Sequence, residues 1–344
     1  MSDRKGAKVS VRPAGPADRQ SGLLISKGGH TRALVFAGLV TLALGGWGCS
    51  SAHDKGASGV ADGAANVPDG APTPDGAADL GAAGDLAALG DGGTTWWHPS
   101  KAATFYWDLQ STPPDNSRNV GVYDIDGFGN TAAEVTLLHQ AGIKVVCYMD
   151  AGTFEPDRPD AASFPAGLKG AAVVGWPGEL WLDVRPSGPN YAALQAIMLA
   201  RFQLCQSKGF DAVEADNIDS YQNKPGFTTT AADQLSYDQW IASTVHSLGM
   251  AAVQKNDLDQ IPMLLGDFDA LLDEECNKFS ECDTLKPYVD ANKPVWNAEY
   301  SDDGETTAKF CAADISAGIT GALFALALDG KEFDPCTNDV GLIH

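Results

Sequence analysis

Short apolar segments alternate with helix-period segments through most of this 344-residue chain. The apolar segments are rich in β-branched and aromatic residues, a composition typical of strands. Between them lie segments such as 191–207, where Leu, Ile, Met and Phe recur at helical spacing. Repeated strand–helix units predict a parallel sheet, and so many of them favour closure into a (β/α)8 barrel, the α/β fold called the TIM barrel.

Nine segments are predicted to be strands, one more than a (β/α)8 barrel needs. They are 104–108, 121–126, 144–150, 180–183, 211–216, 251–256, 270–274, 294–300 and 321–327. The brief segment 180–183 is the one that we expect to lie outside the barrel. The predicted helices are 132–140, 191–207, 231–247 and 307–316.

The chain before residue 96 has a different composition. Residues 1–48 carry seven Lys and Arg against two Asp, and their apolar run at 33–44 is shorter than the roughly 20 residues of a membrane span. These features predict a secretion signal. Residues 49–95 are mostly Ala, Gly, Asp and Pro, which predicts a flexible linker that buries little apolar surface.

Cys49 lies at the junction of these two segments, after Gly48 and before two serines. It resembles the lipid-modified cysteine of bacterial lipoproteins, although Trp47 stands where a small residue is usual. We therefore expect an exported protein. The signal is either cleaved at another position and the protein secreted, or the protein is held at the outer surface by a lipid on Cys49. That lipid would be its one attachment to a membrane.

Residues 96–344 are predicted to be the single folded domain, because about 250 residues suit one (β/α)8 barrel. They hold 15 Lys and Arg against 36 Asp and Glu. This negative charge argues against nucleic acid as a partner. It would attract a cationic substrate, although acidity can also simply favour solubility.

Six cysteines lie in this domain, an even number that fits up to three disulfides in an exported protein. Cys276 and Cys282 are close across a polar loop and are the expected pair. A bridge between Cys311 and Cys336 would hold the C-terminal segment. No CxxC or His-rich spacing accompanies them, which disfavours zinc. The remaining two, which form either a third bridge or two buried thiols, are Cys147 and Cys205.

Most of the predicted strands end in acids or amides. In a (β/α)8 barrel the carboxyl ends of the strands converge on the face where active sites are built. Because like charges repel, stability alone does not explain a ring of carboxylates there. The strand-end residues are Asp108, Asp124, Asp126, Asp150, Asp216, Asn217, Lys255, Asn256, Glu274, Glu275 and Glu299.

Two chemistries use such a ring. A carboxylate pair can cleave a glycosidic bond, and carboxylates can also hold Mg²⁺ or Ca²⁺ for phosphoryl or enolate chemistry. Aromatic residues beside the acids favour carbohydrate, because sugar rings stack on aromatic faces and few basic groups are present to bind phosphate. These aromatic residues are Tyr106, Trp107, Tyr123, Tyr148, Trp176, Trp181, Tyr221, Trp296 and Tyr300.

A set of motifs in a fixed order adds a family resemblance. The motifs are VYDID (122–126), KVVCYMDAG (144–152), WPGELWLDVR (176–185), GFDAVEADNIDSYQN (209–223), KND (255–257), DEEC (273–276) and AEY (298–300). Together they resemble the endo-α-1,4-polygalactosaminidases of glycoside hydrolase family 114 over nearly all of the chain from residue 96. The resemblance implies a (β/α)8 hydrolase that cuts α-1,4-linked galactosamine polymers and has no metal cofactor.

The resemblance also implies catalytic residues. Asp216 falls on the aspartate of the family's acidic motif and would be the nucleophile of a retaining mechanism, with Glu274 as the general acid/base. Two residues depart from the family pattern. Asp150 stands where the family often has a small hydroxyl residue or asparagine, and Asp273 stands where asparagine is usual. Both departures add negative charge near the predicted site, so the resemblance implies the type of reaction more directly than the preferred substrate.

The residues themselves leave alternatives beside this assignment. Glu214 shares the face of Asp216 one layer deeper, so we expect it to support the acid above it. Glu275 competes with Glu274, and because successive strand residues face opposite sides, only one of them should point inward. Lys255 either lowers the pKa of a catalytic carboxylate or is a structural ion-pair partner.

The expected partner is a galactosamine-containing exopolysaccharide, whose ammonium groups the acidic ring would attract. Asp124 and Asp126 could instead cap a loop. Other possible functions are a non-catalytic carbohydrate-binding barrel and a glycosidase that acts on another amino-sugar polymer. The expected substrate contacts are Asp124, Asp126, Tyr148, Asp150, Glu214, Asn217, Asp219, Tyr221, Lys255, Asn256, Glu299 and Tyr300.

Overall fold

The computed structural model describes residues 96–337 of the chain. The predicted signal (1–48), the linker (49–95) and the candidate lipid site Cys49 lie outside the described residues, so they stay predictions. Within 96–337, no helix is long and apolar enough to cross a membrane.

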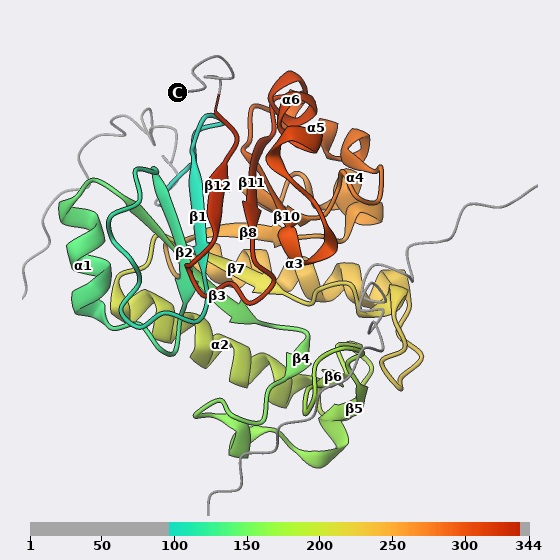
Figure 1. Ribbon diagram of the computed structural model, residues 1–344. Coiled ribbons are helices and arrows are strands. Elements are labelled where there is room, and N and C mark those ends of the chain that lie inside the picture. Colours follow the sequence, from blue (N-terminus) through green and yellow to red (C-terminus); the bar gives the residue numbers. More distant parts are fainter. Residues whose placement is uncertain (1–95, 338–344) are drawn as a thin grey trace, which may run out of the picture. The chain divides into compact units, whose positions relative to one another are not determined.

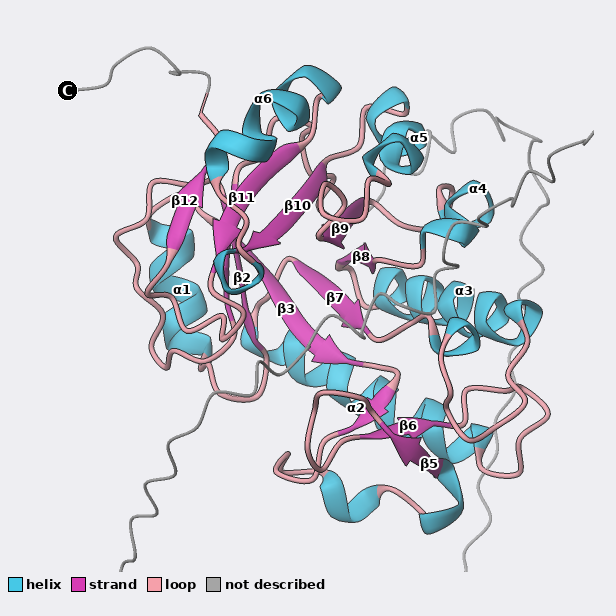
Figure 2. Cartoon of the chain, turned by 45° about the vertical axis from the view of Figure 1, so that its right-hand side comes forward, coloured by secondary structure: helices cyan, strands magenta, loops and turns pink. Residues whose placement is uncertain are grey.

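Eight parallel strands form the barrel, and each pairs with its neighbour in chain order (Figures 1 and 2). This confirms the predicted (β/α)8 fold and all eight of its predicted strands. The strands are β1 (Phe105–Asp108), β2 (Val122–Asp126), β3 (Lys144–Asp150), β7 (Ala212–Asp216), β8 (Ala251–Lys255), β9 (Ala270–Glu274), β10 (Val295–Tyr300) and β11 (Thr320–Phe324).

The four predicted helices are also present. They are α1 (Ala132–Gln140), α2 (Tyr191–Lys208), α3 (Ala231–Ser247) and α6 (Thr307–Ala317). Reciprocal side-chain caps explain where α1 and α3 begin, because Thr131 pairs with Glu134 and Thr230 pairs with Asp233. α2 ends at Gly209, whose positive φ of 88° suits glycine.

The shorter helices were not predicted, because a segment of about one turn shows no helical period. The α-helices of this kind are α4 (Ile261–Leu264) and α5 (Lys286–Asp290). The 3₁₀ helices are η2 (Ala161–Ser163), η3 (Ala166–Leu168), η4 (Ser220–Gln222), η5 (Leu258–Gln260), η6 (Cys282–Leu285) and η7 (Ser301–Asp303).

A ninth strand, β12 (Phe333–Pro335), pairs antiparallel with β11, and Figure 1 draws it between β11 and β1. The ring of Phe333 lies 5.0 Å from that of Tyr106 on β1 and 5.5 Å from that of Phe324 on β11. After β1, the backbone amide of Leu109 donates to the carbonyl oxygen of Leu328 at 2.9 Å. Aromatic packing and loop hydrogen bonds therefore join the two sides of the barrel here.

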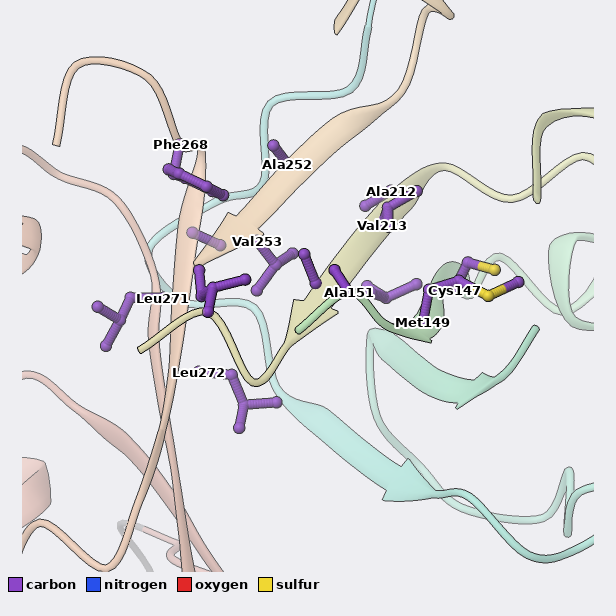
Figure 3. Packing of buried hydrophobic residues seen from close by; sticks show 14 of the residues in the cluster. Cys147, Met149, Ala151, Ala212, Val213, Ala252, Val253, Phe268, Leu271 and Leu272 are labelled. Carbon is purple, nitrogen blue, oxygen red and sulfur yellow. The ribbon is translucent and has the colours of Figure 1, made fainter. Parts of the chain in front are cut away.

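The barrel strands are buried on both faces, as expected for a parallel sheet covered by helices. Leu271 and Leu272 are successive residues of β9, and both are fully buried. Figure 3 shows how such side chains from neighbouring strands pack, including Val213 and Val253. This is why the strands appear in the sequence as nearly continuous apolar runs.

The segment between β3 and α2 forms a second, three-stranded sheet beside the barrel. Its strands are β4 (Thr153–Phe154), β5 (Lys169–Ala172) and β6 (Leu180–Leu182), in the order β4-β6-β5 and all antiparallel. The predicted strand 180–183 is β6, which confirms that it lies outside the barrel. β4 and β5 were not predicted, because their sequences, TF and KGAA, are short and weakly apolar.

Three disulfides link the elements. Cys147 on β3 bonds to Cys205 on α2, so these two residues form a third bridge and are not two buried thiols. The predicted bridges are confirmed, and they are Cys276–Cys282 after β9 and Cys311–Cys336 between α6 and the segment after β12. Three bridges fit an exported protein, because the cytoplasm keeps thiols reduced.

We expect the bridges to differ in their contribution to stability. The Cys147–Cys205 bridge spans 58 residues and the Cys276–Cys282 bridge spans 6. Restricting the longer loop in the unfolded chain is worth about 4 kcal/mol, against about 2 kcal/mol for the shorter one. Urea denaturation of the paired variants Cys147→Ala/Cys205→Ala and Cys276→Ala/Cys282→Ala measures the difference. A larger loss in the second variant would contradict this ranking.

Candidate active site

A cavity of about 490 Å³ opens at the carboxyl ends of the barrel strands. The last residues of four strands line it, and they are Asp216, Lys255, Glu274 and Tyr300. Trp107 near the end of β1 adds an aromatic wall. The convergence of strand ends thus creates the site, as the barrel topology predicts.

Asp216 receives hydrogen bonds on both carboxylate oxygens. The Tyr148 hydroxyl donates to Oδ2 at 2.9 Å, and the backbone amide of Asn217 donates to Oδ1 at 2.8 Å. Asn217 has a φ of 60°, which turns the chain away from the strand at this point. The Asp216 side chain stays 17% exposed, so a ligand in the cavity can reach it.

Glu274 is held by three donors. The Tyr300 hydroxyl donates to its Oε1, while the Lys255 ammonium and the Asn256 amide, the latter at 3.1 Å, donate to its Oε2. The Glu274 side chain is 27% exposed. Burial alone would raise the pKa of Glu274, but the Lys255 charge and these hydrogen bonds hold it below its ordinary value. In the free protein Glu274 is therefore ionised at neutral pH.

Lys255 joins the two carboxylates. Its ammonium lies 3.3 Å from Oδ1 of Asp216 and also forms an ion pair with Oε2 of Glu274. It is 2% exposed and lies 5.5 Å from the centre of the Trp107 ring. Burial would lower the Lys255 pKa, but the nearby carboxylates raise it. Because one nitrogen contacts both oxygens at hydrogen-bonding distance, those oxygens are less than about 6 Å apart.

Half of the twelve expected substrate contacts line this cavity. They are Tyr148, Asn217, Asp219, Lys255, Asn256 and Tyr300. The other six do not line it. These six are Asp124, Asp126, Asp150, Glu214, Tyr221 and Glu299.

Two of the six lie deeper in the barrel. Asp124 and Glu214 are almost fully buried, and Glu214 precedes Asp216 by two residues on the same strand. Burial and their mutual proximity raise the pKa of Glu214 well above its ordinary value, and burial raises that of Asp124 to about 7. The two carboxyl groups therefore lie beneath the cavity, where burial favours their protonated forms, and Asp124 does not cap a loop.

The other four bond to neighbouring protein groups. Asp126 pairs with Arg158 and accepts the Gly129 amide at 2.6 Å, so the loop-capping alternative describes it. The Tyr221 hydroxyl donates to Asp257 at 2.8 Å. Glu299 is buried and accepts the backbone amide of Asn277, also at 2.8 Å.

Asp150 lies behind Asn217. It accepts hydrogen bonds from Thr153 and, at 2.9 Å, from the side-chain amide of Asn217. Burial, together with the negative charges of Glu155 and Asp216, raises the pKa of Asp150 to about 7. Asp150 and Asp273 are both buried. Neither of these two carboxylates lines the cavity wall.

Glu275 lines the cavity together with Glu274, contrary to the expectation that only one of them would point inward. The reason is that β9 ends at Glu274, and Glu275 has a φ of 64°. The alternation of side chains holds only within a strand. Glu275 forms an ion pair with Lys278 at 2.6 Å, and burial raises its pKa to about 7.

Much of the cavity wall comes from loops after the strands, and a prediction based on strand ends alone does not include them. In a (β/α)8 barrel the loops that follow the β-strands also build this face. Aromatic and charged residues in 174–179 and 275–303 were the available signal. The loop residues on the wall include Val174, Trp176, Glu179, Lys278, Phe279, Asp302, Asp303 and Leu326.

One group of potential metal ligands occurs among residues 96–337, formed by Cys276, Cys282 and Asp314. The two sulfurs are bonded to each other in a disulfide, so they are not thiolate ligands. Asp314 accepts side-chain amides from Asn277 and Asn297 at 2.7 and 2.9 Å. This group is therefore a structural one.

Comparison with known proteins gives a consistent result. The model of glycoside-hydrolase family GH114 matches residues 87–339. The crystal structure of Aspergillus fumigatus Ega3 in complex with galactosamine is 30% identical in sequence, with a TM-score of 0.65. The match covers 70% of this chain and 97% of that one.

The glycoside hydrolase domain of PelA from Pseudomonas aeruginosa shares the fold, at 17% identity and a TM-score of 0.52, over 67% of this chain and 97% of that one. No curated protein sequence matches the chain significantly. The family match spans most of the chain and agrees with the family resemblance of its motifs. The chain belongs to glycoside-hydrolase family GH114.

Proposed function

We propose that residues 96–344 form the catalytic domain of an endo-α-1,4-polygalactosaminidase, which hydrolyses α-1,4-linked galactosamine polymers. The main support is the pair of carboxylates, Asp216 and Glu274, that share one ammonium at the mouth of the barrel. Family membership and the galactosamine bound in the structure of Ega3 support the choice of sugar.

In the proposed retaining mechanism, Asp216 attacks the anomeric carbon while Glu274 protonates the departing glycosidic oxygen. Water then cleaves the glycosyl–enzyme ester, with Glu274 as the general base. A separation below about 6 Å between the two oxygens that share Lys255 suits retention, which uses carboxyl groups about 5 to 5.5 Å apart. Because Glu274 is ionised in the free protein, it must take up its proton when substrate is bound.

The cavity wall is predominantly acidic. Besides Asp216 and Glu274 it carries two cations, Lys255 and Lys278, and five further acids, which are Glu179, Asp219, Glu275, Asp302 and Asp303. Excess negative charge in a cleft concentrates a cationic ligand. De-N-acetylated galactosamine carries an ammonium group, so the cavity favours a polymer with free amines over a fully acetylated one.

The test is product release from α-1,4-galactosamine polymers that differ in acetylation. We expect faster release from the de-N-acetylated polymer than from the acetylated one. Added salt should lower the rate on the first several-fold, because it screens the attraction, and should change the second little. A β-1,4-linked glucosamine polymer, which is also cationic but differs in sugar and in linkage, is the control for recognition beyond charge. Equal rates on all three polymers would refute the proposed specificity.

We further propose that residues 1–48 direct export, that 49–95 link the domain to the surface, and that Cys49 carries a lipid. The three disulfides support an exported protein. A Cys49→Ser variant should move from the membrane fraction to the medium. Equal distribution of the variant and the native protein would overturn the proposed lipid on Cys49.

A further inference from the structure

The inserted sheet between β3 and α2 gives the cavity a wall that the barrel does not supply. Its base is firmly packed, because Leu168 and Leu182 are fully buried and Trp181 nearly so. The backbone amide of Leu182 donates to the carbonyl oxygen of Gly152 at 2.9 Å, which ties β6 to the end of β3. Figure 2 shows this sheet beside the barrel, where the chain continues from β3.

The turn between β5 and β6 carries apolar side chains that this base does not bury. Trp176 is 50% exposed and Val174 is 66% exposed, and both line the cavity. The turn is closed by a hydrogen bond from the amide of Val173 to the carbonyl oxygen of Glu179 at 3.0 Å. Gly175, with a φ of 89°, allows the tight return of the chain. The indole is thus presented on a short hairpin with a fixed base.

Stability does not account for this position of Trp176. An apolar side chain stabilises a fold in proportion to the surface that it removes from water, and half of this one remains exposed. A broad aromatic face beside polar groups suits the apolar face of a sugar ring. Glu179 supplies such a polar group, because it lines the same cavity at the end of the same turn and contacts the Thr153 hydroxyl at 3.3 Å.

We propose that Trp176 is the stacking platform of a sugar subsite separate from the Asp216–Glu274 pair, with Glu179 bonding to the polar edge of the same sugar. This inference rests on the proposed function, since it names a further contact for the same polymer. The platform lies on the inserted hairpin, whereas Asp216 and Glu274 lie at the ends of β7 and β9. Both places lie on the wall of one cavity, so we expect a chain of several sugars to occupy them together and a shorter oligomer to reach only one.

The experiment compares Trp176→Ala, Trp176→Phe and Leu137→Ala on α-1,4-galactosamine oligomers of graded length. Leu137 on α1 is the matched control, because it is 55% exposed and does not line the cavity. For Trp176→Ala we expect KM on long oligomers to rise about tenfold, with kcat and the cleavage of short oligomers unchanged. Trp176→Phe should retain most of the affinity, and Leu137→Ala should match the native protein.

Binding distinguishes failure of this inference from failure of the proposed function. Calorimetric titration of long oligomers into Glu274→Gln and Glu274→Gln/Trp176→Ala proteins measures the contribution of Trp176 to the dissociation constant in the absence of hydrolysis. An equal dissociation constant in the two proteins, or no binding in either, overturns the subsite. Absence of hydrolysis by the native protein, with a tenfold difference in binding between these two proteins, overturns the proposed activity and supports the subsite.

Discussion

Asp216→Asn and Glu274→Gln proteins are expected to release product from α-1,4-galactosamine polymer about 10² to 10⁴ times more slowly than the native protein. An amide is neither a nucleophile nor a proton donor, and acid–base catalysis by one group is worth about 10² to 10⁴ in rate. Product release is measured by the appearance of reducing ends. Each substitution keeps the shape of the side chain, so circular dichroism should show an unchanged fold.

Asp290→Asn is the control for the loss of one negative charge. Asp290 is exposed on α5, pairs with Lys286, and lies outside the cavity wall. Its activity should equal that of the native protein. Native-like product release by both catalytic-pair variants would exclude these two residues from the chemistry.

Azide separates the roles within the pair. With an activated α-glycosyl substrate, azide should replace the missing nucleophile in Asp216→Ala and give a β-glycosyl azide. In Glu274→Ala it should intercept the covalent intermediate and give an α-glycosyl azide. Products of the opposite configuration would exchange the assigned roles of Asp216 and Glu274.

A Lys255→Met protein is expected to lose about 3 kcal/mol of unfolding free energy at neutral pH, and much of its activity. The change removes one partner from a buried ion-pair cluster and leaves two carboxylates without their shared cation. Methionine fills a similar volume, so lost packing contributes little. Activity should fall because Asp216 and Glu274 would lose the shared ion pair that orients both carboxylates.

The stability difference should depend on pH in a defined direction. Lys255 lowers the pKa of Glu274 in the folded state. The stabilisation is therefore present above the unfolded value of about 4.5 and is lost as pH falls through the folded value. Urea denaturation from about pH 7 to about pH 3 should show the native and Lys255→Met curves converging in acid.

Lys208→Met is the matched control for this experiment. The Lys208 ammonium donates to the carbonyl oxygens of Gly127, Phe128 and Asn130, which do not titrate. Asp126 and Glu134 act on its charge more weakly than burial does, so its stability loss should change less over the same range. A loss in Lys255→Met that is equally constant would mean that its charge does not act through Glu274.

The barrel strands and the four long helices could be predicted because burial on both strand faces leaves continuous apolar runs, and long helices show their period. The depth of a side chain within the barrel could not be predicted in the same way. Asp216 and Glu214 share a strand face, but only Asp216 reaches the cavity. Glu275 was misjudged because a single residue of positive φ ends the alternation.

The cavity wall was the least predictable part, because loops contribute much of it. Trp176 could be identified in the sequence as an aromatic residue near acids. Its position depends on the pairing of β5 with β6, which the repeated strand–helix pattern of the barrel does not predict. Asp126 and Glu299 look like site residues in the sequence. Their partners, Arg158 and the Asn277 amide, come from other loops, and only the fold brings them together.

The position of β12 has a consequence for the order in which the protein can fold. Tyr106 on the first strand meets Phe333 on the last, more than 200 residues later. Such contacts cannot form until the chain through β12 has emerged from the ribosome, and closing so large a loop is slow. The barrel is therefore completed only after its last strand has been made, and its earlier strands remain open to wrong partners until then.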